Sequence, residues 1–140
     1  MKAEFSWVGQ VRGWSRPRFD SRSKRVFNDK KLKQYQKEIA EAYRKQCPGA
    51  YFYKGDPLRV SVHVFRPLPE SRPKRISAEP DTIKPDADNM AKAVLDALNG
   101  VAFDDDAQVV ELHVTKHRRI RGALERVTVS IERCEYEHCI

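Results

Sequence analysis

An alternating run between Leu58 and Phe65 most constrains how this chain can fold. Aliphatic side chains occupy every second position, and mostly polar side chains lie between them. Because side chains alternate across a strand, the run predicts a strand with one buried and one exposed face. Looser alternation over residues 4–11, 109–115 and 124–132 supplies partner strands. The residues expected to face the core from the last two strands are Val110, Leu112, Val114, Val127, Val129 and Ile131.

Two helices are predicted among these strands. Residues 29–46 carry apolar side chains three and four positions apart, the spacing of one helix face. Residues 89–98 form the second helix, with Asp88 as its N-cap and Asn99-Gly100 as its end. The order β-α-β-α-β-β predicts an α+β fold, a small mixed β-sheet with two main helices packed on one face.

One domain covering residues 1–140 is expected, because a chain of this length can bury a core without disulfides. Residues 66–83 contain four prolines and are expected to form a long mobile loop. No apolar run approaches the roughly 20 residues of a membrane span, and the N-terminus lacks a signal-peptide core. A cytoplasmic protein without membrane contact is therefore expected. No glycine-rich phosphate-binding motif occurs, which predicts no nucleotide cofactor.

An acidic segment interrupts a chain whose formal net charge is +7. From residue 86 to residue 106, six acids and one base leave a net charge of −5. The acids are Asp86, Asp88, Asp96, Asp104, Asp105 and Asp106. A ten-residue helix rises about 15 Å and five extended steps return about 17 Å, which predicts that Asp105 and Asp106 come back beside the helix start. Converging carboxylates are the ligands of Mg²⁺, with Mn²⁺ as a plausible substitute.

Ordinary structural roles could account for each of these residues taken alone. Asp88 can be only an N-cap, residues 104–106 only a solvated turn, and Lys92 only a surface partner of Asp88. Capping does not require Asp86 as well, and like charges brought together destabilise a fold unless a cation offsets them. Convergence therefore favours a metal site, with Lys92 close enough to neutralise a phosphate.

Basic residues gather elsewhere in the chain. Residues 10–46 hold twelve bases and four acids, a net charge of +8, and a second cluster lies between residues 116 and 121. Phosphodiester substrates require such cations, although a solvated face is the usual role of surface bases. Trp14 and Phe19 lie among arginines and either stack on unpaired bases or anchor loops. The expected DNA contacts are Arg16, Arg18, Lys74, Arg75, Lys84, Lys116, Arg118, Arg119 and Arg121.

The acidic segment resembles the RusA family of Holliday junction resolvases. The matching motifs are Lys84-Pro85-Asp86-Ala87-Asp88-Asn89, Lys92, Asp96-Ala97-Leu98, Asp105 to Val109 and, more weakly, Arg16-Pro17-Arg18-Phe19. The resemblance implies that Asp86, Asp88 and Asp106 are catalytic metal ligands and that Lys92 is the catalytic lysine. It places Asp105 at a secondary acidic position among the metal ligands. It also implies a homodimer, and small chains of this type often sit in phage or prophage genomes.

The function expected on these grounds is that of a Mg²⁺-dependent, structure-selective endodeoxyribonuclease. It would resolve four-way DNA junctions by paired symmetric cuts in recombination and repair. Two alternatives stay open at this point. A related nuclease could act on flaps, forks or phage packaging intermediates, or a non-catalytic DNA-binding protein could hold a structural cation in the acidic segment.

Overall fold

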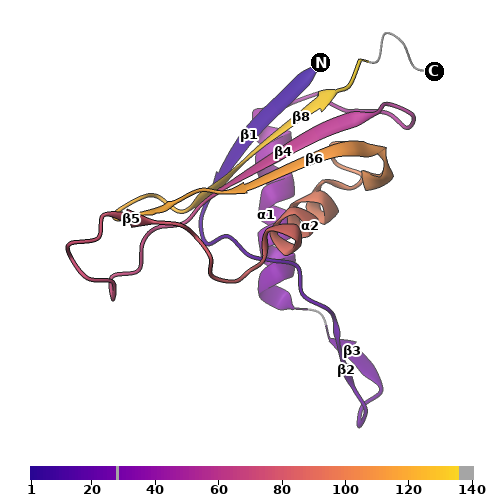
Figure 1. The fold of residues 1–140 in the computed structure, drawn as a ribbon. Coiled ribbons are helices and arrows are strands. Elements are labelled where there is room, and N and C mark those ends of the chain that lie inside the picture. Colours follow the sequence, from indigo (N-terminus) through magenta and orange to yellow (C-terminus); the bar gives the residue numbers. More distant parts are fainter. Residues whose placement is uncertain (28, 136–140) are drawn as a thin grey trace.

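The structure, a computed structural model, describes residues 1–27 and 29–135. Figure 1 shows the long strands in one layer with both helices on one side of it, while a narrow two-stranded ribbon projects away from the body. The elements are β1 (Lys2–Val8), β2 (Arg18–Asp20), β3 (Arg25–Phe27), α1 (Lys30–Gln46), β4 (Leu58–Phe65), β5 (Ala78–Glu79), α2 (Ala87–Leu98), β6 (Val109–Lys116), β7 (Arg119–Ile120) and β8 (Arg126–Arg133). In this part of the chain neither helix is long and apolar enough to cross a bilayer.

The main sheet has the strand order β1-β8-β4-β6. Strand β4 pairs antiparallel with β8 and parallel with β6, while β8 also pairs antiparallel with β1. Two small ribbons accompany this sheet, β2 with β3 and β5 with β7. The predicted α+β class, with a mixed sheet and two main helices, is confirmed.

The core lies between the helices and one face of the sheet. The four aliphatic residues of β4 are fully buried, as the alternating pattern predicts, and so are Val127, Val129 and Ile131 of β8. The prediction was wrong for Val110 and Leu112, which are 54% and 44% exposed. Strand β6 is at the edge of the sheet and has a neighbouring strand on one side only, so its side chains are less covered than those of β4.

Both helices begin at aspartates. The Asp29 carboxylate accepts the backbone N–H groups of Lys31 and Leu32 at 2.9 and 3.2 Å, which explains where α1 starts. Helix α2 starts two residues earlier than predicted, and its N-cap is Asp86 rather than Asp88. Asp88 therefore lies inside the first turn of α2, and its presence there is not explained by capping.

The proline-rich segment 66–83 is not the free loop that its composition suggests. Within it, β5 pairs with β7, and the buried Arg66 and Asp81 side chains meet in an ion pair of 2.7 Å. Hydrogen bonds to the main chain, described below, fasten the segment to the β6–β7 region. The expectation of a long mobile loop is therefore wrong, because polar contacts replace the apolar contacts that the sequence lacks.

Candidate active site

Helix α2 presents a single row of polar side chains to solvent. Asp88 and Lys92 are exposed, Asp96 is half-buried, and Asn99, just past the helix end, is exposed. Spacings of four, four and three residues align these side chains on one face of a helix with 3.6 residues per turn. The rest of the helix packs into the core. Its buried residues are Met90, Ala91, Ala93, Val94, Leu95, Ala97 and Leu98.

Two carboxylates occupy the N-terminal end of this row. Asp86 is the N-cap residue, but its side chain makes no capping hydrogen bond, and the cap is formed without it. Asp88 follows in the first turn. Both carboxylates lie at the end of α2 where the aligned peptide dipoles favour negative charge. Both carboxylates thus lie at the start of the helix, and the Asp86 side chain makes no capping hydrogen bond.

The other two candidate ligands lie at the opposite end of the row. The Asp106 backbone N–H donates to Asn99 Oδ1 at 2.9 Å, and Asp105 caps a short 3-10 helix, Asp106–Gln108, by accepting from Ala107 N–H at 3.1 Å. The predicted return of Asp105 and Asp106 to the helix start is therefore wrong. Asp88 and Asn99 are eleven residues apart, about 16 Å along the helix axis.

A tight turn prevents the extended return. Gly100 N–H donates to Phe103 O at 2.8 Å, and Ala102 N–H donates to Leu98 O at 2.9 Å, so the chain doubles back directly after α2. Phe103 and Ala102 are both fully buried, which fixes this turn in the core. Residues 101–106 consequently stay at the C-terminal end of the helix.

The carboxyl groups at this end repel one another. Burial, and then the neighbouring Asp105 and Asp96 carboxyl groups, raise the pKa of Asp106. The Ala107 N–H, followed by a hydrogen bond with Asp106, lowers the pKa of Asp105. A divalent cation would relieve this repulsion, and hard carboxylate oxygens suit Mg²⁺ or Mn²⁺. Yet within residues 1–27 and 29–135 no three His, Cys, Asp or Glu side chains form a group able to hold a metal.

Asp104 serves the fold instead. Its carboxylate accepts from the Tyr51 hydroxyl at 2.6 Å and from the Lys54 backbone N–H. It thereby ties the connection between α1 and β4 to the turn after α2. These contacts give Asp104 a structural role.

Lys92 is held by an aromatic ring that the sequence did not identify as its partner. Its Nζ lies 3.6 Å from the centroid of the Trp14 ring, and Trp14 N–H donates to Asn89 O at 2.9 Å. The cation–π contact holds the ammonium group of Lys92 against this ring. No ion pair joins Lys92 to Asp88 in the described structure, so the simple surface-pair interpretation does not apply.

Two cationic side chains, Arg66 and Lys116, hold the backbone of the segment before Asp86. Arg66 Nη2 donates to Asp81 Oδ1 at 2.7 Å and to Ile83 O at 2.9 Å, while Arg66 Nη1 donates to Lys84 O at 3.1 Å. Lys116 Nζ donates to Ile83 O at 2.7 Å and to Pro85 O at 3.0 Å. Three successive carbonyls are thus bound directly ahead of the first carboxylate. The sequence analysis did not predict this network. The one signal in the sequence that could have indicated it is Arg66, a base directly after the alternating run of β4.

Three of the bases expected to contact DNA are occupied within the protein. Lys116 is only 13% exposed, Arg119 Nε donates to Pro67 O at 3.0 Å, and Arg121 donates to the carbonyls of Arg72, Pro73 and Ile76. They fasten the 66–83 segment in place. The other expected contacts are exposed: Arg16, Arg18, Lys74, Arg75, Lys84 and Arg118.

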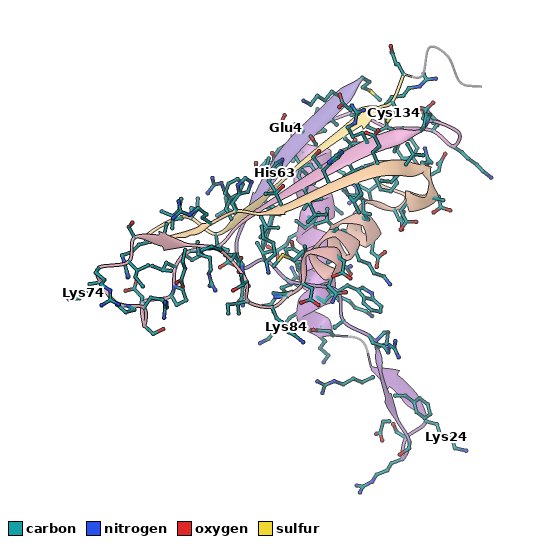
Figure 2. All side chains as sticks on the ribbon, in the orientation of Figure 1. Glu4, Lys24, His63, Lys74, Lys84 and Cys134 are labelled. Carbon is teal, nitrogen blue, oxygen red and sulfur yellow. The ribbon has the colours of Figure 1, made fainter. Side chains whose placement is uncertain are left out.

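Exposed bases lie on the two projecting segments and on the chain just before α2. Figure 2 shows Lys74 on the projecting 66–83 segment and Lys24 on the β2–β3 ribbon, and in this view Lys84 lies between them. Loop residues 9–17 also reach this region, where Gly13 packs against Pro85 so closely that a Cβ at Gly13 would lie 2.6 Å from the Pro85 ring. The first carboxylate, Asp86, thus follows the exposed Lys84 by two residues, and both basic segments project from the same molecule, an arrangement suited to a polyanion.

Comparison with known proteins agrees with this arrangement. A family model described as "Endodeoxyribonuclease RusA" matches residues 9–132, which include the α2 row, the turn after it and the whole main sheet except β1 and the last residue of β8. The chain is also 35% identical over 126 residues to the "Uncharacterized protein YqaN" of Bacillus subtilis (strain 168), covering 81% of this chain and 85% of that protein. The chain belongs to the RusA family of endodeoxyribonucleases.

Proposed function

We propose that this protein is a Mg²⁺-dependent endonuclease that resolves four-way DNA junctions by paired symmetric cuts. The observation that carries the proposal is the polar row of α2. Carboxylates lie at its start, a lysine lies in its middle, and two carboxyl groups that repel each other lie at its end. Family membership supplies the reaction class, cleavage inside a DNA strand.

The proposed roles follow from the side chains. Asp86, Asp88, Asp105 and Asp106 would hold the metal, which when bound activates water and neutralises charge on the phosphate. Lys92, oriented by the Trp14 ring, would bind a phosphate oxygen beside the metal. Mn²⁺, which accepts the same ligands, would support the reaction as well.

Separation of the carboxylates supports a dimer. Along α2, Asp88 is about 12 Å from Asp96 and about 16 Å from Asn99, whereas oxygens bound to one Mg²⁺ lie about 3 to 4 Å apart. We propose that two copies set their α2 rows antiparallel about a two-fold axis. Asp86 and Asp88 of one copy would then face Asp105 and Asp106 of the other, giving two metal sites for two strands.

Exposed apolar side chains support contact between copies at this surface. Val110 and Leu112 lie on β6, directly after the 3-10 helix that carries Asp106. Both side chains lie on an edge strand just after the carboxyl pair and are free to pack against a second copy. A two-fold contact through this strand would bury both copies of each side chain.

Mixed dimers test shared sites directly. Differently tagged Asp88→Asn and Asp106→Asn chains are coexpressed, isolated as mixed dimers and incubated with a supercoiled cruciform plasmid and Mg²⁺. If sites are shared, the mixed dimer has one intact site and nicks the plasmid without linearising it, while each homodimeric variant is inactive and the wild type linearises it. Sites formed within one chain predict no nicking by the mixed dimer.

Two controls separate the parts of this proposal. Each variant should bind the junction as tightly as the wild type or more tightly, because removing a carboxylate spares the cations. Wild-type cleavage of a four-way junction, a flap and a linear duplex, with and without Mg²⁺, identifies the substrate. A wild-type protein that binds these DNAs and cuts none of them would refute the nuclease proposal and leave a DNA-binding protein.

A further inference from the structure

The β2–β3 ribbon stands apart from the core. Its strands pair only with each other, through Arg18 with Phe27, Phe19 with Val26 and Asp20 with Arg25. Figure 1 shows the ribbon projecting beyond the start of α1, away from the main sheet. A two-stranded ribbon of this size is marginally stable by itself. Because β2 and β3 pair only with each other, the outer edges of the ribbon are open to a ligand.

The acid in this arm is used inside it. Asp20 accepts from the Arg22 backbone N–H at 3.0 Å and from the Ser23 hydroxyl at 2.9 Å, and the Lys24 backbone N–H donates to Asp20 O at 2.8 Å. The Arg22 N–H, followed by Ser23, lowers the pKa of Asp20, so it remains charged within the turn. Among the described side chains in and just before the arm, four bases are exposed: Arg16, Arg18, Arg22 and Lys24.

Phe19 is an exposed apolar side chain of the arm. It is 65% exposed and lies in β2 on the opposite face from its neighbours Arg18 and Asp20. Trp14, an aromatic residue just before the arm, already has its ring against Lys92 and its backbone N–H on Asn89 O. An aromatic ring left in water among cations is suited to a ligand with a flat π-face and an anionic backbone.

We propose that the arm enters the branch point of a DNA junction and that Phe19 stacks on a base exposed there, while the surrounding cations bind the backbone. The inference rests on the proposed action on branched DNA. In a linear duplex each base is covered by its neighbours, whereas a branch point offers uncovered base faces. The arm would thus give the protein a means of distinguishing a junction from a duplex, separate from the carboxylates that cut.

Substitutions at Phe19 separate stacking from apolar bulk. Phe19→Ala and Phe19→Leu should weaken binding to a four-way junction by about 5- to 150-fold, the range expected for one lost base–aromatic stack. Phe19→Trp should retain junction affinity. All three should bind a linear duplex as the wild type does. Val8→Ala is the matched control, because it shortens a β1 side chain that is 54% exposed. It should change neither the affinity for the junction nor the affinity for the duplex.

Fluorescence gives an independent readout. The additional emission of Phe19→Trp, relative to the wild type, should be quenched by the junction and not by the duplex at equal occupancy. The inference is overturned if Phe19→Ala or Phe19→Leu binds the junction within twofold of the wild type, or if affinity for the duplex falls equally. A wild-type protein that neither prefers nor cuts junctions would refute the proposed function instead, so the two failures are distinguishable.

Discussion

The buried carboxylate of Asp81 allows a sharp test of what holds the proline-rich segment. Its side chain has no exposed surface. It accepts from Arg66 Nε at 2.8 Å and Arg66 Nη2 at 2.7 Å, and Lys116 Nζ lies 3.8 Å away. Asp81→Asn keeps the size of the side chain and removes its charge. Two poorly exposed cations would then share a site without a counter-ion.

The expected cost is large for one substitution. Removing one partner of a buried ion pair costs about 3 to 5 kcal/mol, because the remaining charge is buried without compensation. For a chain of 140 residues this lowers the melting temperature by about 10 to 17 °C. Arg72–Glu79 is the matched control, since its side chains are 43% and 29% exposed. Glu79→Gln should therefore cost at most about 1 kcal/mol.

Urea unfolding of both variants measures these costs, provided the slope against denaturant stays constant. A cost below about 1 kcal/mol for Asp81→Asn, equal to that of Glu79→Gln, would refute the reasoning that this charge is essential to the segment. Cleavage should also fall more than junction binding in Asp81→Asn. Arg66 and Lys116 bind the carbonyls just before Asp86, and their displacement shifts a metal ligand rather than a DNA contact.

Acid should act through the same carboxylate. Burial alone would raise the pKa of Asp81, but hydrogen bonds from Arg66 and the charges of Arg66 and Lys116 outweigh it, and the pKa is lowered below 3.8. A lowered pKa adds stability that is complete above the unfolded value and is lost as pH falls through the folded one. The free-energy difference between wild type and Asp81→Asn should therefore shrink below about pH 4.

Three further predictions concern the site and the sheet. Among the consecutive acids, cleavage should fall most in Asp106→Asn, then in Asp105→Asn, and least in Asp104→Asn, as measured on a labelled junction; equal loss in all three would contradict the assignment. Junction affinity should fall steeply as NaCl is raised, because backbone phosphates dominate binding, and a flat response in a filter-binding titration would rule that out. Burial, followed by the charges of His63 and Arg126, lowers the pKa of His117. The stability that His117 contributes is therefore complete above about pH 6.5 and is lost as the pH falls. In urea titrations between about pH 5 and 7, the free energy of unfolding of His117→Gln should depend less on pH than that of the wild type.

Elements with a strong repeat could be predicted from the sequence. The alternation in β4 and the apolar spacing of α1 depend on neighbours within a few residues, and both are present in the structure. Strands of two or three residues, such as β5 and β7, are too short to show any period. Leu112 was misassigned because its pattern reports a strand face, whereas its exposure depends on being at the sheet edge.

The candidate site divides in the same way. Local sequence was sufficient to nominate the acids and Lys92, but their arrangement depends on the tight turn after α2, which burial of Phe103 imposes. Charge alone could not separate Arg121, which binds carbonyls within the chain, from Arg118, which remains exposed. A carbonyl and a phosphate oxygen both accept from a guanidinium group, and only the fold determines which one lies within reach.

A side chain that donates a hydrogen bond to a main-chain carbonyl does not depend on which side chain the acceptor residue carries. Between Pro67 and Pro85, the bonds from Arg119, Arg121 and Lys116 all end on backbone oxygens. Exposed side chains on that segment, such as Lys74, can therefore be exchanged without loosening its attachment, whereas the buried Asp81 cannot. If the segment contacts DNA as proposed, substitutions of its exposed residues can alter substrate preference, while the cations that hold its backbone stay unchanged.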